Sequence, residues 1–199
     1  MQYVRRSFGA AALAMCLAGT AAGQGSRELV IQATAGGLHG LASFNRHGVY
    51  DTNASLGLSG ALGVQIVDKL VVRGDVAYSK SPIEFHGAEI GSDFTKVFGS
   101  VLFEIRPLPE SALRPYILAG GGVGFLNQHS TAEPKQTRGL LVGGLGLGYR
   151  VGRTPLSISL ESKVYLYQAK GLIGSARSDS RTQADALFGV GLSYGIPLG

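Results

Sequence analysis

The stretch of sequence that decides the fold is Leu156-Ser157-Ile158-Ser159-Leu160-Glu161-Ser162-Lys163-Val164-Tyr165-Leu166-Tyr167-Gln168. Large apolar residues fill most of its even positions, and serine, charged and tyrosine residues fill its odd positions. Successive side chains of a β-strand point to opposite faces of the sheet. The spacing therefore predicts a strand with one apolar face and one largely polar face.

Seven further stretches alternate in a similar way, and each is at least as long as the roughly 9–11 residues that a tilted transmembrane strand needs. In the stretch Arg138–Val151, glycines lie opposite Leu145, Leu147 and Tyr149. Small residues on the less apolar face suit the narrow interior of an eight-stranded barrel. The other predicted strands are Leu29–Gly40, Ala54–Val67, Leu70–Lys80, Phe94–Arg106, Arg114–Leu126 and Ala184–Ile196.

The connections between these strands alternate in length, and this order favours a membrane barrel over a soluble β-sandwich. A sandwich also has alternating strands, but its apolar faces point inward. Outer-membrane barrels have short periplasmic turns and long extracellular loops. The sequence therefore predicts an all-β, eight-stranded antiparallel up-and-down transmembrane β-barrel with four extracellular loops. Long connections are predicted at Leu41–Asn53, Ser81–Asp93, Asn127–Thr137 and Ala169–Gln183, and short ones at Asp68-Lys69, Pro107–Leu113 and Gly152–Pro155.

The first 23 residues have the order of a secretory signal peptide. Two arginines form a positive segment, an apolar stretch follows over Phe8–Leu17, and small residues precede a cleavage site before Gln24. The apolar stretch is shorter than the 20 or so residues of a transmembrane helix. We expect a signal peptide at 1–23, a barrel domain at 24–199 and export to the cell outer membrane. A twin-arginine signal and a lipidated Cys16 are the less favoured alternatives.

Composition argues against several functional classes. The chain has 18 Lys and Arg against 13 Asp and Glu, and loss of two arginines with the signal peptide leaves 16 against 13, a formal charge of +3. This mild and scattered excess is not the footprint of a nucleic-acid-binding protein. The single cysteine leaves with the signal peptide, so the mature chain can form neither a disulfide nor a cysteine-based metal site. The glycine-rich runs complete no nucleotide-binding motif, and no cofactor is expected.

Four features carry a resemblance to a known family. They are the signal peptide, the glycine-rich runs Arg114–Phe125 and Gly143–Arg150, and the last strand. With them the chain resembles the outer-membrane β-barrel domain family of small porin-like proteins, which includes OmpA-like and OmpX-like barrels. The resemblance implies a monomer set among outer-membrane lipid and lipopolysaccharide, with periplasmic chaperones and the barrel-assembly machinery as partners. The chain departs from the family at its end, where Pro197-Leu198-Gly199 follow the residues that this machinery reads.

Nine charged residues fall on the polar faces of the predicted strands and would line the barrel interior. Charges removed from bulk water must be paired or hydrated. An eight-stranded barrel is just wide enough to be filled by side chains, which favours a salt-bridged plug over a narrow ion or solute path. The predicted lumen network is Arg73, Asp75, Lys96, Glu104, Arg106, Arg150, Glu161, Lys163 and Asp185.

The favoured function is a non-enzymatic outer-membrane barrel, porin-like or structural, that presents four loops for surface contacts. One alternative is a lipid A-modifying enzyme of the deacylase type using His129, Ser130 and Glu133. A serine nucleophile needs a hydrogen-bonded base and an orienting acid, and adjacency in a loop shows neither. A second alternative is a soluble periplasmic β-sandwich binding protein. A metal site would require several outer loops to converge. The histidines concerned are His39, His47 and His86.

Overall fold

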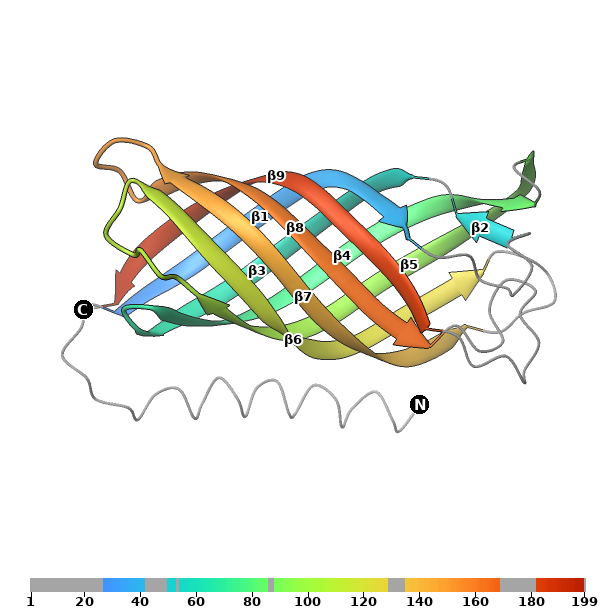
Figure 1. The fold of residues 1–199 in the computed structure, drawn as a ribbon, viewed down its shortest axis with the longest axis horizontal. Helices are drawn as coiled ribbons and strands as arrows, with labels where there is room; N and C mark the ends of the chain where they lie inside the picture. The colour runs from blue at the N-terminus through green and yellow to red at the C-terminus, as the bar shows by residue number, and fades with distance from the viewer. Residues whose placement is uncertain are drawn as a thin grey trace.

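Long antiparallel strands make up most of the molecule. The computed structural model describes residues 27–41, 50–52, 54–85, 88–128, 135–168 and 182–198. Among these residues are eight long strands, each hydrogen-bonded to the long strands before and after it in the chain and tilted across the long axis of the molecule (Figure 1). The predicted number and order of strands are confirmed. The long strands are β1 (Arg27–Gly40), β3 (Ser55–Val67), β4 (Leu70–Phe85), β5 (Ala88–Ile105), β6 (Leu113–Gln128), β7 (Gln136–Arg150), β8 (Leu156–Gln168) and β9 (Thr182–Leu198).

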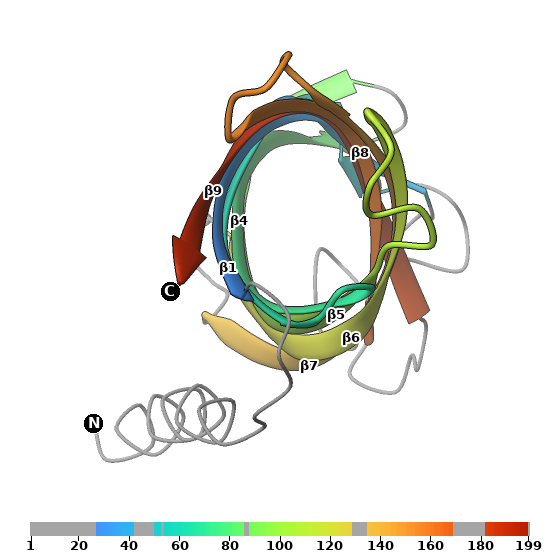
Figure 2. The same cartoon turned by 90° about the vertical axis from the view of Figure 1, so that its left-hand side faces the viewer.

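The sheet closes on itself because the first and last strands pair. The β1–β9 ladder runs from Arg27 opposite Leu198 to Gly40 opposite Asp185. Figure 2 looks along the barrel and shows the strands forming a complete ring. Closure leaves no exposed sheet edge, whose backbone N–H and C=O groups would lack hydrogen-bond partners in lipid. The first strand has little apolar contrast in sequence, yet its backbone is paired on both sides, with β9 and with β3.

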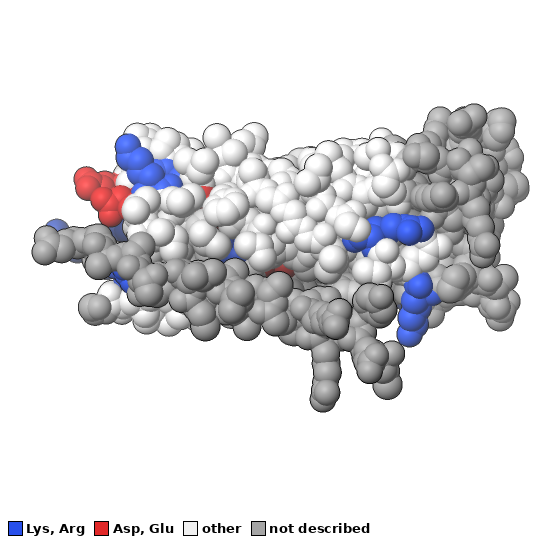
Figure 3. Space-filling model, turned by 90° about the horizontal axis from the view of Figure 1, so that it is seen from below, with Lys and Arg blue, Asp and Glu red and all other residues white. Residues whose placement is uncertain are grey.

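The apolar side chains point outward and the polar ones point into the barrel. Leu56, Leu141 and Phe188 are 68%, 67% and 58% exposed, whereas Arg73 and Lys163 are 3% and 0% exposed. A soluble sandwich would have the opposite arrangement, so that alternative is overturned. In Figure 3 most of the described surface visible around the middle of the barrel lacks charged residues, which gather toward the two ends. The described residues contain no helix long and apolar enough to cross a membrane.

The two ends of the barrel differ. At one end, here called the turn end, lie the β3–β4, β5–β6 and β7–β8 connections together with the start of β1 and the end of β9. At the opposite end, the loop end, β1, β4, β6 and β8 finish and the strands that follow them begin. The register shows that strands begin and finish at these two ends in strict alternation. The three predicted short connections thus all lie at the turn end, and three of the four predicted long connections join strands at the loop end.

One predicted loop, Ser81–Asp93, is instead a β-hairpin. β4 continues to Phe85 and β5 begins at Ala88, with Lys80 opposite Thr95 and Phe85 opposite Ala88. Backbone pairing between β4 and β5 continues beyond the residues that alternate in hydrophobicity. The register shifts just after Pro82, which has no N–H to donate. A short strand, β2 (Tyr50–Thr52), also lies within the predicted first loop and pairs with the end of β4.

Candidate functional site

The turn-side half of the barrel interior contains a buried layer of charged side chains. Arg73 of β4 lies at its centre. Its Nη1 lies 3.0 Å from both Glu104 Oε2 and Glu161 Oε2, and its Nη2 lies 2.9 Å from Asp75 Oδ2. Lys163 Nζ lies 2.8 Å from Asp75 Oδ2 and 3.0 Å from Glu161 Oε1. We call these five residues, drawn from β4, β5 and β8, the ionic layer.

Neutral groups complete the hydrogen bonds of this layer. Gln32 Nε2 donates to Glu161 Oε2 at 3.1 Å, and the hydroxyl of Tyr116 donates to the same oxygen at 2.9 Å. Lys163 also donates to Ser59 Oγ at 3.1 Å. The glycines of β7 make room for these contacts, because a β-carbon at Gly146 would overlap the ring of Tyr116. Side chains from β1, β3 and β6 are therefore hydrogen-bonded to the ionic layer.

A second ion pair lies nearer the loop end. Lys96 Nζ is 3.0 Å from Asp185 Oδ1 and 3.3 Å from Thr52 Oγ1, and the Tyr167 hydroxyl donates to Asp185 Oδ2 at 2.8 Å. Both charged groups are fully buried. Because the Thr52 contact comes from β2, this pair also holds part of the first long connection against the barrel interior.

The loop-side half of the lumen is filled mainly by apolar side chains, which the sequence analysis did not predict. Phe98 stacks on Tyr165 with ring centroids 4.5 Å apart and lies 5.8 Å from the ring of Tyr167. The signal was present in the sequence: Phe94, Phe98 and Leu102 share the parity of Lys96, so they point inward with it. The cluster also includes Leu38, Ala77, Ile83, Leu118, Leu126, Leu140, Val142 and Leu187, and it reaches the ionic layer at Tyr116.

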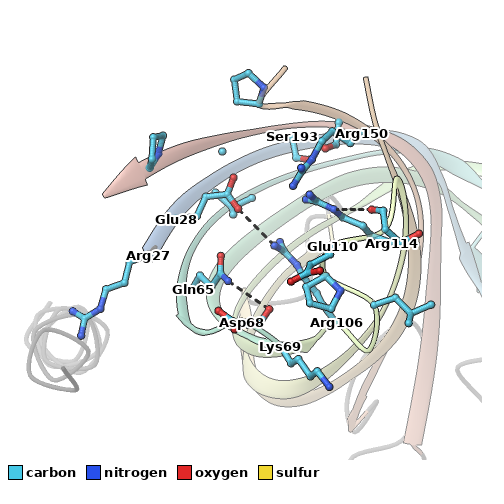
Figure 4. A pocket seen from close by; sticks show the side chains of 18 of the residues that line it. Arg27, Glu28, Gln65, Asp68, Lys69, Arg106, Glu110, Arg114, Arg150 and Ser193 are labelled. Atoms are coloured by element: carbon cyan, nitrogen blue, oxygen red, sulfur yellow. Dashed lines mark hydrogen bonds and ion pairs between the residues drawn. The ribbon is translucent and has the colours of Figure 1, made fainter. Parts of the chain in front are cut away.

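The turn end opens into a cavity of about 950 Å³, which we call the vestibule (Figure 4). Its walls come from the start of β1, the end of β9 and the short connections. Six basic residues line it against three acidic ones, Glu28, Asp68 and Glu110. The basic residues are Arg27, Lys69, Arg106, Arg114, Arg150 and Arg153.

Most of the nine residues predicted for the lumen are buried there, but they do not form a single network. Five make the ionic layer and two make the Lys96–Asp185 pair. Arg106 lies at the border with the vestibule, where its Nε is 2.6 Å from Glu104 Oε1 and its Nη1 is 3.9 Å from Glu28 Oε2. Arg150 departs from the prediction: it is exposed and lines the vestibule, because it is the last residue of β7 and lies beyond the ionic layer.

The residues weighed for catalysis and metal binding are not brought together by the described structure. His129, Ser130 and Glu133 lie outside the described residues, as do His47 and His86. His39 is exposed on β1. Within the described ranges, no group of three or more His, Cys, Asp or Glu side chains could hold a metal ion.

A closed ring of eight antiparallel strands, apolar outside and ion-paired inside, defines a small transmembrane β-barrel. Three solved structures share this fold at 12% to 15% sequence identity. The chain is similar to Neisserial surface protein A, with a TM-score of 0.62, 14% identity and coverage of 83% of this chain and 96% of that one. It is also similar to a major outer membrane protein from Thermus thermophilus (TM-score 0.57, 12% identity, 86% and 100% covered).

A third similar structure is the N-terminal barrel domain of Pseudomonas aeruginosa OprF (TM-score 0.53, 15% identity, 87% and 100% covered). The predicted resemblance to small outer-membrane barrels is thereby confirmed for the fold. No family model matches the sequence, and no curated protein matches it.

Proposed function

We propose that this chain is a non-enzymatic bacterial outer-membrane barrel with a closed interior, and that it meets other molecules through the connections at its loop end. The observation that carries the proposal is the filled lumen. The ionic layer occupies the turn-side half, and the Phe98–Tyr165 stack lies beyond it toward the loop end. Each would have to rearrange before a hydrated ion could pass.

Planar-bilayer recording tests the closed interior. We expect the purified, folded chain to insert without discrete conductance steps, while a general porin added to the same membrane gives them. Reproducible single-channel steps from the native chain would show that the lumen conducts and would reject the closed barrel.

The proposed location is the outer membrane, with the turn end in the periplasm. The shared fold and the predicted signal peptide support the location, and the short connections at the turn end support the orientation. Two exposed positions at opposite ends allow a direct test: Ser111 in the β5–β6 connection and Lys135 just before β7. In a Cys16→Ala background, a membrane-impermeant maleimide should label Lys135→Cys on whole cells and Ser111→Cys only after lysis. The reverse pattern would invert the orientation.

The non-enzymatic part of the proposal is tested on lipid A itself. Overexpression of the native chain should leave the mass spectrum of lipid A unchanged. Loss of an acyl chain that depends on Ser130, shown with a Ser130→Ala variant, would establish the deacylase alternative instead.

A further inference from the structure

The vestibule contains a pair of arginines that neither the ionic layer nor the barrel wall explains. Arg114 is on β6 and Arg150 is on β7, and the two strands are paired, with Arg114 opposite Gly148. The Arg150 amide donates to the Ala112 carbonyl at 3.0 Å, which sets Arg150 diagonally across from Arg114. Figure 4 shows the two guanidinium groups pointing toward each other in the mouth of the barrel.

Two like charges that face each other repel unless an anion lies near them. Among the described residues, no carboxylate comes within ion-pair distance of either guanidinium, although Asp68 and Glu110 line the same cavity. Arg106, in contrast, has both Glu104 and Glu28 beside it. The vestibule thus supplies carboxylates to Arg106 and none to the arginine pair.

Arg114 is also held in place. Its Nε donates to the Ser111 carbonyl at 3.2 Å, which fixes the plane of the guanidinium. Its Nη2 is buried and has no hydrogen-bond partner among the described residues. A buried N–H donor without an acceptor is costly, and a bound oxygen would satisfy it. A negatively charged oxygen would therefore both balance the positive charge and accept a hydrogen bond from the unused donor.

We propose that Arg114 and Arg150 form a binding site for the phosphate or carboxylate group of a water-borne anion that enters through the turn end. Guanidinium forks bind such groups through paired, charge-assisted hydrogen bonds. A cavity of about 950 Å³ can accept a small molecule around the bound group. This site goes beyond the closed barrel proposed above and is independent of what the loop end contacts.

The position of the pair favours a soluble anion over a lipid headgroup. Both arginines belong to the inward-facing set of their strands, as do Tyr116 on β6 and Gly146 on β7. The barrel wall therefore stands between the guanidinium groups and the surrounding lipid. A lipid phosphate would have to bend around the rim of the barrel to reach them.

Calorimetric titration of the folded chain in zwitterionic micelles tests the site, with inorganic pyrophosphate as the probe and no phosphate in the buffer. We expect saturable binding of one pyrophosphate per chain. Arg114→Gln and Arg150→Gln should each weaken it at least tenfold, because each removes one fork of the pair. Arg138→Gln is the matched control, since it removes the same charge at the loop end. Heat-modifiable gel migration confirms that each variant is folded.

Three results would overturn the proposal. One is the absence of saturable binding to the native chain. Another is equal weakening by Arg138→Gln, which would mean that pyrophosphate responds only to net charge. The third is displacement of pyrophosphate by phosphatidylglycerol added to the micelles, which would assign the arginines to lipid. Weakening confined to the two vestibule variants, and unaffected by that lipid, supports the site.

Discussion

Removal of Glu161 should destabilise the barrel more than removal of a charge from its exposed surface. The carboxylate accepts from both Nη atoms of Arg73, from Lys163, from Gln32 and from the Tyr116 hydroxyl. A Glu161→Gln side chain has the same shape but turns an NH₂ group toward some of these donors. It also leaves the buried cations with one countercharge fewer.

The magnitude follows from the charge balance. With Arg106 included, the ionic layer holds three cations, Arg73, Arg106 and Lys163, against three carboxylates, those of Asp75, Glu104 and Glu161. Breaking a buried pair by removing one member costs about 3–5 kcal/mol. Glu161→Gln should therefore lower the free energy of unfolding by that amount, and Lys163→Met by a similar amount.

The double variant Glu161→Gln with Lys163→Met restores the balance, with two cations against two carboxylates. The free energy of unfolding that it loses should be smaller than the sum of the two single losses by about 0.5–3 kcal/mol, the range found for residues in one network. The chain has no tryptophan, so unfolding in urea is best followed by circular dichroism and by the fraction of folded band on a gel. The exposed pair Lys80–Asp93 provides the control, and Lys80→Gln should leave the unfolding midpoint unchanged.

Two outcomes would refute this reasoning. If Glu161→Gln has the same urea midpoint of unfolding as the native chain, water solvates the ionic layer well enough that its charges need no ion-pair partners. If the double variant loses the sum of the two single losses, the residues do not act as one network.

Two further predictions concern the two faces of β7. Gly146→Ala should destabilise the folded chain by about 1–3 kcal/mol because its β-carbon would push Tyr116 away from Glu161, whereas Gly143→Ala, with open space at its β-carbon, should have little effect in the same urea titration. On the lipid-facing side, Leu145→Arg near the middle of β7 should cost about 2–4 kcal/mol of folding into lipid vesicles, and Leu113→Arg at the turn end only about 0–1 kcal/mol. Equal losses for the two glycine variants would contradict the assignment of inward and outward positions. Equal losses for the two leucine variants would contradict the assigned depths in the membrane.

The barrel could be predicted from sequence because alternation and loop parity are both local patterns. The stretch Leu156–Gln168, with its strict alternation, is β8 with the same bounds. The extension of β4 and β5 through Ser81–Asp93 could not be predicted, since those residues show little apolar contrast and their strand state depends on pairing across the hairpin.

The interior was predicted in part, for a similar reason. Parity alone placed Arg73 and Glu161 in the lumen, where they are ion-paired. Parity does not give the depth of a residue along the barrel axis, so it could not separate the ionic layer from the Lys96–Asp185 pair or place Arg150 in the vestibule. Depth depends on strand tilt and register, which are set by contacts between distant parts of the chain.

The wall of this barrel is a single β-sheet, so consecutive residues of a strand face different surroundings. Fluid acyl chains can pack against apolar side chains of any shape, so outward positions such as Leu141 and Leu145 tolerate substitution by other apolar residues. Inward positions such as Tyr116 must interlock with fixed neighbours. Packing in the interior therefore constrains only about half of the residues, because only every second side chain of a strand faces inward. Proteins that share only 12% to 15% of their residues with this chain can accordingly close the same ring. Distant relatives should be recognisable when the inward positions are compared by themselves.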